Sequence, residues 1–155
     1  MGAIKTTNIV EGNLAAEPAY FPKGQYTARI SFRILHTDRR LNPQTNQWED
    51  GRTSAVDVNF YGTTAERYAR TIAQQPGLYA KGVAVVAWGE MSDRPNAYVD
   101  RDGTAQAVPV INGTRIIPNQ PVNQRRADRL QTTDLPQRTD VTPEQDPWAS
   151  RQPQP

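Results

Sequence analysis

Apolar and polar residues alternate over several short stretches of the chain, as they do in half-buried β-strands. These stretches are TNIVEGNL at residues 7–14, QYTARISFRIL at 25–35, AVDVNFY at 55–61 and GVAVVAWGEM at 82–91. A fifth strand is expected to run toward Ile117, after a hairpin that turns at Asp102 and Gly103. The polar residues 36–54, between the second and third strands, are expected to form a long loop or a loosely paired hairpin.

The apolar spacing changes after residue 62 to the stripe of an amphipathic α-helix. The stripe consists of Ala65, Tyr68, Ala69 and Ile72. Thr63 and Glu66 have the spacing of a capping box, so Thr63 is expected to cap the start of the helix. Pro76 and Gly77 both oppose a helix, which is therefore expected to end before them.

Three strands, one helix and two further strands is the element order of the OB-fold, a five-stranded Greek-key barrel. The helix would lie between the third and fourth strands, where it can close one end of the barrel. A small α+β sheet domain shares parts of this order, so the pattern alone leaves both folds open. Our prediction is an all-β domain with one helix, an OB-fold, over residues 1–117.

The alternation ends at Pro118, and residues 118–155 are rich in Pro, Gln, Asn, Thr and Arg. Such a segment buries too little apolar surface to offset the entropy of ordering, so it is predicted to be a disordered tail. A short helix around residues 125–130 would be marginal on its own. The 155-residue chain has 36% hydrophobic residues and 13 prolines, which fits one small domain followed by an unpacked tail.

The sequence offers little for catalysis. His36 is the only histidine and there is no cysteine, so a Ser-His-Asp triad lacks its supporting residues and zinc lacks its usual ligands. DRDG at residues 100–103 matches only the start of a calcium loop and fits a hairpin turn better. We therefore expect no enzyme activity, no metal and no cofactor. No apolar run has the length of a membrane span or a signal-peptide core, which predicts a cytoplasmic protein without a membrane partner.

Cations and aromatic rings recur at outward-facing positions of the predicted strands and loops. The candidate binding residues are Arg29 and Arg33 on the second strand, Arg39, Arg40 and Trp48 in the polar segment, Tyr61 on the third strand, Trp88 on the fourth, and Arg94, Tyr98 and Arg101 around the last hairpin. Rings stack on unpaired bases and guanidinium groups neutralise phosphates, so the set indicates an interface for single-stranded nucleic acid. The net charge is only +2, so any basic surface is local. A protein–protein assembly module or an RNA-binding OB domain would also use such a surface.

Five segments fall in the order and spacing of the bacterial single-stranded DNA-binding proteins, so the chain resembles that family over roughly residues 8–117. They are IVEGNLAAEP, YTARISF, WEDGRTSAVDVNFYGTTAERYA, KGVAVVAWGEM and YVDRDG. The resemblance implies an OB-fold and sequence-independent binding of single-stranded DNA during replication, recombination or repair, usually by a homotetramer. It implies base stacking on Tyr61 and Tyr98. Ala55 stands where the family often has a further aromatic ring.

The tail departs from the family pattern. The family typically ends in an acidic tip closed by a Pro-Phe pair that recruits replication and repair proteins. This chain ends in RQPQP, and from residue 119 onward five arginines balance five acidic residues. QDPW at residues 145–148 partly resembles the family tip but lies inside the chain. The sequence therefore does not predict recruitment through the tail, and such a tail would suit a phage, plasmid or paralogous member of the family.

Overall fold

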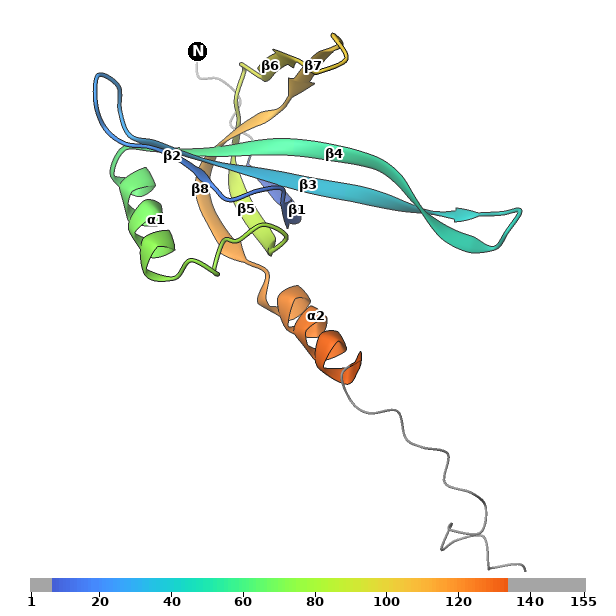
Figure 1. Cartoon of the computed structure of the whole chain (residues 1–155). Helices are drawn as coiled ribbons and strands as arrows, with labels where there is room; N and C mark the ends of the chain where they lie inside the picture. The colour runs from blue at the N-terminus through green and yellow to red at the C-terminus, as the bar shows by residue number, and fades with distance from the viewer. Residues whose placement is uncertain (1–6, 134–155) are drawn as a thin grey trace, which may run out of the picture. The chain divides into compact units, whose positions relative to one another are not determined.

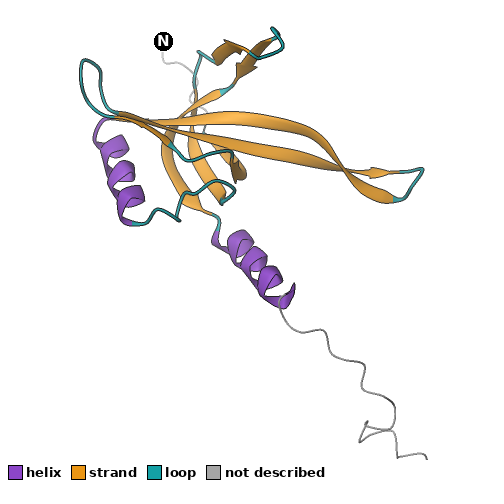
Figure 2. Ribbon diagram, in the orientation of Figure 1, coloured by secondary structure: helices purple, strands orange, loops and turns teal. Residues whose placement is uncertain are grey.

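The computed structural model describes residues 7–133, which form a mostly β protein with two helices (Figures 1 and 2). The strands are β1 (Asn8–Leu14), β2 (Ala19–Phe21), β3 (Arg29–Asn42), β4 (Gln47–Tyr61), β5 (Ala84–Met91), β6 (Asn96–Val99), β7 (Ala105–Val108) and β8 (Val110–Pro118). Helix α1 (Gly62–Gln74) lies between β4 and β5 in the chain, and α2 (Gln120–Thr133) follows β8. Neither helix is long and apolar enough to cross a membrane. The chain divides into two compact units, residues 1–123 and 124–155, and all eight strands belong to the first.

The main sheet has six strands in the order β1-β5-β8-β4-β3-β2, and β1 also pairs with β3. The pairing of β1 with β3 covers Asn13 with Leu35 and Leu14 with Ile34, and it joins the five longer strands into a barrel. Gly12 makes this closure sterically feasible, because a Cβ atom there would lie 2.5 Å from the carbonyl oxygen of Leu35. The predicted five-stranded OB barrel is confirmed, with β2 as an added edge strand that the sequence pattern did not reveal.

The polar segment 36–54 forms paired strands rather than a loop. β3 and β4 pair in antiparallel register from Arg29 and Tyr61 to Asn42 and Gln47, with a bulge between Thr37 and Arg39. In Figure 1 the two strands continue together well past the rest of the sheet. Of the two alternatives predicted for this segment, the hairpin is confirmed.

The core holds the apolar faces that the alternation predicted. Ile30, Phe32, Ile34, Val58 and Phe60 are each 2% exposed or less. Aromatic rings fill the space beneath α1, where those of Phe32, Phe60, Tyr68 and Tyr79 meet edge to face or tilted with centroids 4.6–6.2 Å apart. Helix α1 buries Ala65 completely and packs Tyr68 and Ile72 against the core, as its apolar stripe predicted.

The start of α1 differs from the capping-box prediction. Tyr61 is the N-cap residue and makes no side-chain capping bond, and Thr63 already lies inside the helix. The reason is the left-handed backbone of Gly62, with φ of 62°, which turns the chain from β4 into α1 without an intervening residue. The helix ends at Gln74, before Pro76 and Gly77, as predicted.

The second helix corrects the prediction of a single helix and of disorder from residue 118. Helix α2 covers Gln120–Thr133, a longer span than the marginal helix expected around residues 125–130. Its first turn is tied to β5, because the Asn123 side chain accepts a 3.0 Å hydrogen bond from the Ala84 N–H and donates one of 3.0 Å to the Ala84 carbonyl. This anchor is polar, so the small number of apolar residues in the segment does not reveal it. The rest of the predicted tail, residues 134–155, lies outside the described residues.

Candidate nucleic-acid interface

The outward faces of β3 and β4 carry polar and aromatic side chains in matched rows. Antiparallel pairing sets Arg29 opposite Tyr61, Ser31 opposite Asn59, and Arg33 opposite Asp57. Residues between these positions, such as Ile30 and Phe60, belong to the buried core, so the three pairs share the outer face. Two of the rows contain predicted binding residues, and their chemistry differs.

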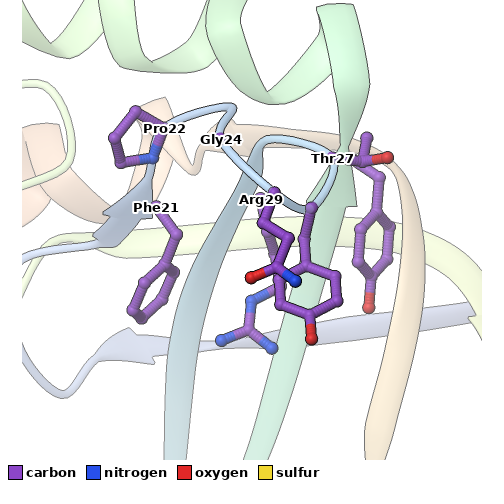
Figure 3. A pocket seen from close by; sticks show the side chains of 8 residues that line it. Phe21, Pro22, Gly24, Thr27 and Arg29 are labelled. Carbon is purple, nitrogen blue, oxygen red and sulfur yellow. The ribbon is translucent and has the colours of Figure 1, made fainter.

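The first row, which we call the Tyr61 rung, consists of Phe21, Arg29 and Tyr61 on β2, β3 and β4. Phe21 pairs with Arg29, and Arg29 pairs with Tyr61. The Arg29 guanidinium lies over the Phe21 ring, 4.5 Å from its centroid, and Figure 3 shows the two side chains close together. Phe21 and Tyr61 are 47% and 49% exposed. No carboxylate within residues 7–133 forms an ion pair with Arg29, although its charge helps to lower the pKa of Asp57 nearby.

The second row, which we call the Asp57 rung, is an internal ion pair. Arg33 donates from Nε and Nη2 to the two carboxylate oxygens of Asp57 at 2.7 and 2.9 Å, and Asn96 Nδ2 donates to Asp57 Oδ2 at 3.1 Å. Burial of Asp57 opposes its ionisation, but the hydrogen bonds from Arg33 and Asn96 outweigh burial and hold the pKa of Asp57 below its ordinary value. The same bond raises the pKa of Arg33. The charge of Arg33 is therefore already matched within the protein.

The Asp57 rung also positions the β6–β7 hairpin. Asn96, which bonds to Asp57, is the first residue of β6. Tyr98 lies on β6 too, and its ring centroid is 5.9 Å from the guanidinium carbon of Arg33. Tyr98 is 43% exposed. We infer that the buried carboxylate of Asp57 and the cation beside it hold Tyr98 against the outer face of β3 and β4.

The tip of this hairpin is closed by Asp100. Its Oδ1 accepts the N–H groups of Asp102 and Thr104 at 3.0 and 2.9 Å, and its Oδ2 accepts Gln106 Nε2 at 2.9 Å. Gly103 has φ of 80°, as this tight turn requires. DRDG is therefore a hairpin turn, as predicted, and Arg101 within it and Arg94 before it are exposed.

At the far end of the β3–β4 hairpin, Trp48 on β4 pairs with Leu41 on β3, and the two side chains are 61% and 47% exposed.

The cations at this end of the hairpin have acidic neighbours. Arg39 Nε lies 3.9 Å from Asp50 Oδ1, and Arg40 pairs across the strands with Glu49. His36 Nε2 lies 3.3 Å from Asp38 Oδ1. The tip thus presents an exposed ring among cations that have acidic neighbours.

Trp88 lies on another sector of the barrel. It is half-buried on β5, opposite Ile9 of β1 and Arg115 of β8. Ile9 and Ile117 expose 64% and 43% of their surface on the same group of strands. Apolar side chains lie here beside the exposed Arg115 and Glu11, and Trp88 belongs to a different surface from the Tyr61 and Asp57 rungs.

The structure therefore brings Arg29 to Tyr61, brings Arg33 to Tyr98, and leaves Trp48 and Trp88 apart from both pairs. The residue that the sequence analysis missed is Phe21. It lies on a strand of only three residues, too short for an alternation to appear. The signal was the pair of adjacent rings in AYF directly before a Pro-Lys-Gly turn.

No protein-family model matches the chain. It is 35% identical over 120 residues to a single-stranded DNA-binding protein of Corynebacterium glutamicum, an alignment covering 76% of this chain and 48% of the relative. It is 27% identical over 129 residues to one of Paenarthrobacter aurescens, covering 82% and 69%. The chain spans about half the length of the first curated relatives it matches, 48%, 48% and 44%.

The fold supports the same relationship. The crystal structure of a small single-stranded DNA-binding protein from Streptomyces coelicolor superimposes with a TM-score of 0.54 at 19% identity, covering 76% of this chain and 97% of that one. At this identity the likeness concerns the fold. The sequence similarities extend over 104 to 129 residues of this chain, and they support its membership in the family of bacterial single-stranded DNA-binding proteins.

Proposed function

We propose that the protein binds and protects single-stranded DNA without catalysing a reaction. The observation that carries this proposal is the Tyr61 rung, in which two half-exposed rings flank a guanidinium group that has no carboxylate partner within residues 7–133. Unpaired bases stack on such rings for about 1–3 kcal/mol each, and the cation neutralises a phosphate. The relatives named as single-stranded DNA-binding proteins support this choice.

The strand would follow the outer face of β3 and β4. Tyr61 and Tyr98 supply rings on that face, and Trp48 supplies one at the end of the long hairpin. Arg29, Arg94 and Arg101 are exposed cations along this path. Because stacking on a ring is tolerant of sequence, binding is expected to be largely independent of base identity.

We propose that the protein is a homo-oligomer, in keeping with the tetramer that the family resemblance implies. The sector containing Ile9, Trp88 and Ile117 supports this proposal, because exposed apolar residues on neighbouring strands suit contact with a second copy. The same sector is the one feature that favours the alternative of a protein assembly module. Light scattering would give the mass in solution, and a monomer would contradict the proposal.

Roles in replication, recombination or repair follow from this function as proposals, as does location in the cytoplasm, where exposed strands arise.

Titration with oligo-dT at two salt concentrations, followed by tryptophan fluorescence, tests DNA binding. We expect quenching and a marked loss of affinity at the higher salt concentration, because each neutralised phosphate releases counterions. No binding at low salt would refute the proposed function. Competition with oligo-U separates DNA from RNA, and equal affinity for both would favour the RNA-binding alternative.

A further inference from the structure

A hollow of about 600 Å³ opens beside the Tyr61 rung (Figure 3). Phe21, Arg29 and Tyr61 line it from the sheet, and Pro22, Tyr26 and Thr27 line it from the segment that joins β2 to β3. This volume lies within the range of about 300–1,000 Å³ that is typical of small-ligand sites. Residues 25–28 of this segment were expected in a strand, which begins only at Arg29, and no binding role was predicted for them.

The walls of the hollow are set by the strand register. Phe21, Arg29 and Tyr61 occupy one row on three adjacent strands, which lie about 4.8 Å apart, so the Cα atoms of Phe21 and Tyr61 are about 10 Å apart. The connecting segment turns back sharply through a 3.1 Å hydrogen bond from the Gly24 N–H to the Tyr26 carbonyl. Tyr26, 80% exposed, follows that turn. The hollow is therefore bounded by fixed backbone on two sides.

Its chemistry selects one class of ligand. Three of its lining residues are aromatic, one is a guanidinium group, and none is acidic. The guanidinium carbon of Arg29 lies 4.5 Å from the centroid of the Phe21 ring, and this contact limits the positions that the guanidinium group can take. A ligand that fits must combine a flat apolar group with a negative charge, and a nucleotide has both.

We propose that this hollow, the Phe21 hollow, holds one nucleotide of the bound strand, with its base against the rings of Phe21 and Tyr61 and its phosphate on Arg29. The inference rests on the proposed function and adds Phe21 to the residues that contact DNA. It also gives Arg29 a specific role, because this guanidinium group, which has no ion pair within residues 7–133, lies on the strand between those of Phe21 and Tyr61.

The test compares two neighbouring residues of β2. Phe21→Leu removes the ring in the hollow, whereas Tyr20→Leu is the matched control, because Tyr20 borders α1 beside Glu66 and Arg70 and does not line the hollow. Both side chains are partly exposed, at 47% and 39%, so both variants are expected to fold, and urea unfolding checks this. The dissociation constant for oligo-dT is measured by competition against a labelled strand at several salt concentrations.

We expect Phe21→Leu to weaken binding about tenfold with an unchanged salt slope, and Tyr20→Leu to stay within twofold of the unsubstituted protein. A Phe21→Leu affinity within twofold would overturn the inference while leaving the proposed function intact. If the unsubstituted protein itself does not bind, the proposed function fails instead.

Phe21→Trp separates contact from structural support. This variant keeps a ring in the hollow, so affinity is expected within about threefold of the unsubstituted protein, and the added indole is expected to increase the fractional quenching on binding oligo-dT. Weakened binding by Phe21→Leu without added quenching in Phe21→Trp would show that the ring acts through the fold, which also overturns the inference.

Discussion

Arg29 and Arg33 lie on the same strand and the same face, four residues apart, yet their surroundings differ. Arg29 stacks on Phe21 and has no ion pair within residues 7–133. Arg33 is bonded through two nitrogens to Asp57, which is itself buried. Two cations on the same outward face therefore differ in whether their charge is already matched within the protein. Arg29 has no ion-pair partner within residues 7–133, whereas Arg33 is part of the protein's own structure.

The difference follows from which residue each arginine meets across the strand. Opposite Arg29 stands Tyr61, which offers a ring, and opposite Arg33 stands Asp57, which offers a carboxylate. The β6–β7 hairpin then covers the second pair through Asn96. The Tyr61 rung thus suits direct contact with DNA, and the Asp57 rung suits the positioning of Tyr98.

Of the variants considered, Tyr61→Ala is expected to have the largest effect on DNA binding. We expect it to weaken binding of oligo-dT by about 1–3 kcal/mol, because one stacked base loses its ring. The free energy of unfolding is expected to change by less than about 0.5 kcal/mol, since the side chain is 49% exposed. An unfolded variant would instead make Tyr61 a packing residue.

Asp57→Ala tests whether the Asp57 rung stabilises the fold and positions the β6–β7 hairpin. We expect the free energy of unfolding to fall by about 1–2 kcal/mol, because two charge-assisted hydrogen bonds from Arg33 are lost while that side chain, 39% exposed, regains some hydration. Amide hydrogen exchange in β6 and β7 should accelerate, since Asn96 loses its partner. Asp93→Ala, at an exposed acid before the hairpin, is the control and should change neither quantity. Unchanged exchange in the hairpin would contradict the positioning role of Asp57.

The salt dependence of binding compares the two arginines directly. Arg29→Gln is expected to lower the magnitude of the slope of log affinity against log salt by about 0.7, the value for one phosphate contact with a single strand. Arg33→Gln is expected to leave that slope nearly unchanged, because its charge is matched by Asp57. If the salt slope changed equally in both variants, the proposed difference between Arg29 and Arg33 would be wrong.

The smallest expected effect is that of pH. The pKa of Asp57 is lowered from 3.8 in the folded protein, so the ionised carboxylate favours folding, and its contribution is complete above the unfolded value. The contribution should therefore be constant between about pH 5 and 8 and decline as pH falls below about 4 through the folded pKa. Urea unfolding across this range checks the decline, and the Asp57→Ala variant should lack this part of it.

Much of the barrel could be predicted because buried apolar residues recur at the regular spacing of a strand or a helix. The alternation of Val56, Val58 and Phe60 identified a core strand, and the stripe through Ala65 and Ile72 identified the packed face of α1. Phe21 was not predictable, since a three-residue strand has no period. Helix α2 was missed because its anchor is a polar side chain, that of Asn123, which no count of apolar residues detects.

The order of the five barrel strands and α1, most of the core faces and the outward position of Tyr61 could be predicted from the sequence, since each depends on local spacing along one strand or helix. Which outward residues meet depends instead on the pairing of the strands in the folded protein. Register across β2, β3 and β4 placed Phe21 beside Arg29 and Tyr61, and placed Asp57 against Arg33. The availability of a charge depends on its neighbours in space, and those neighbours come from strands that are distant in the chain.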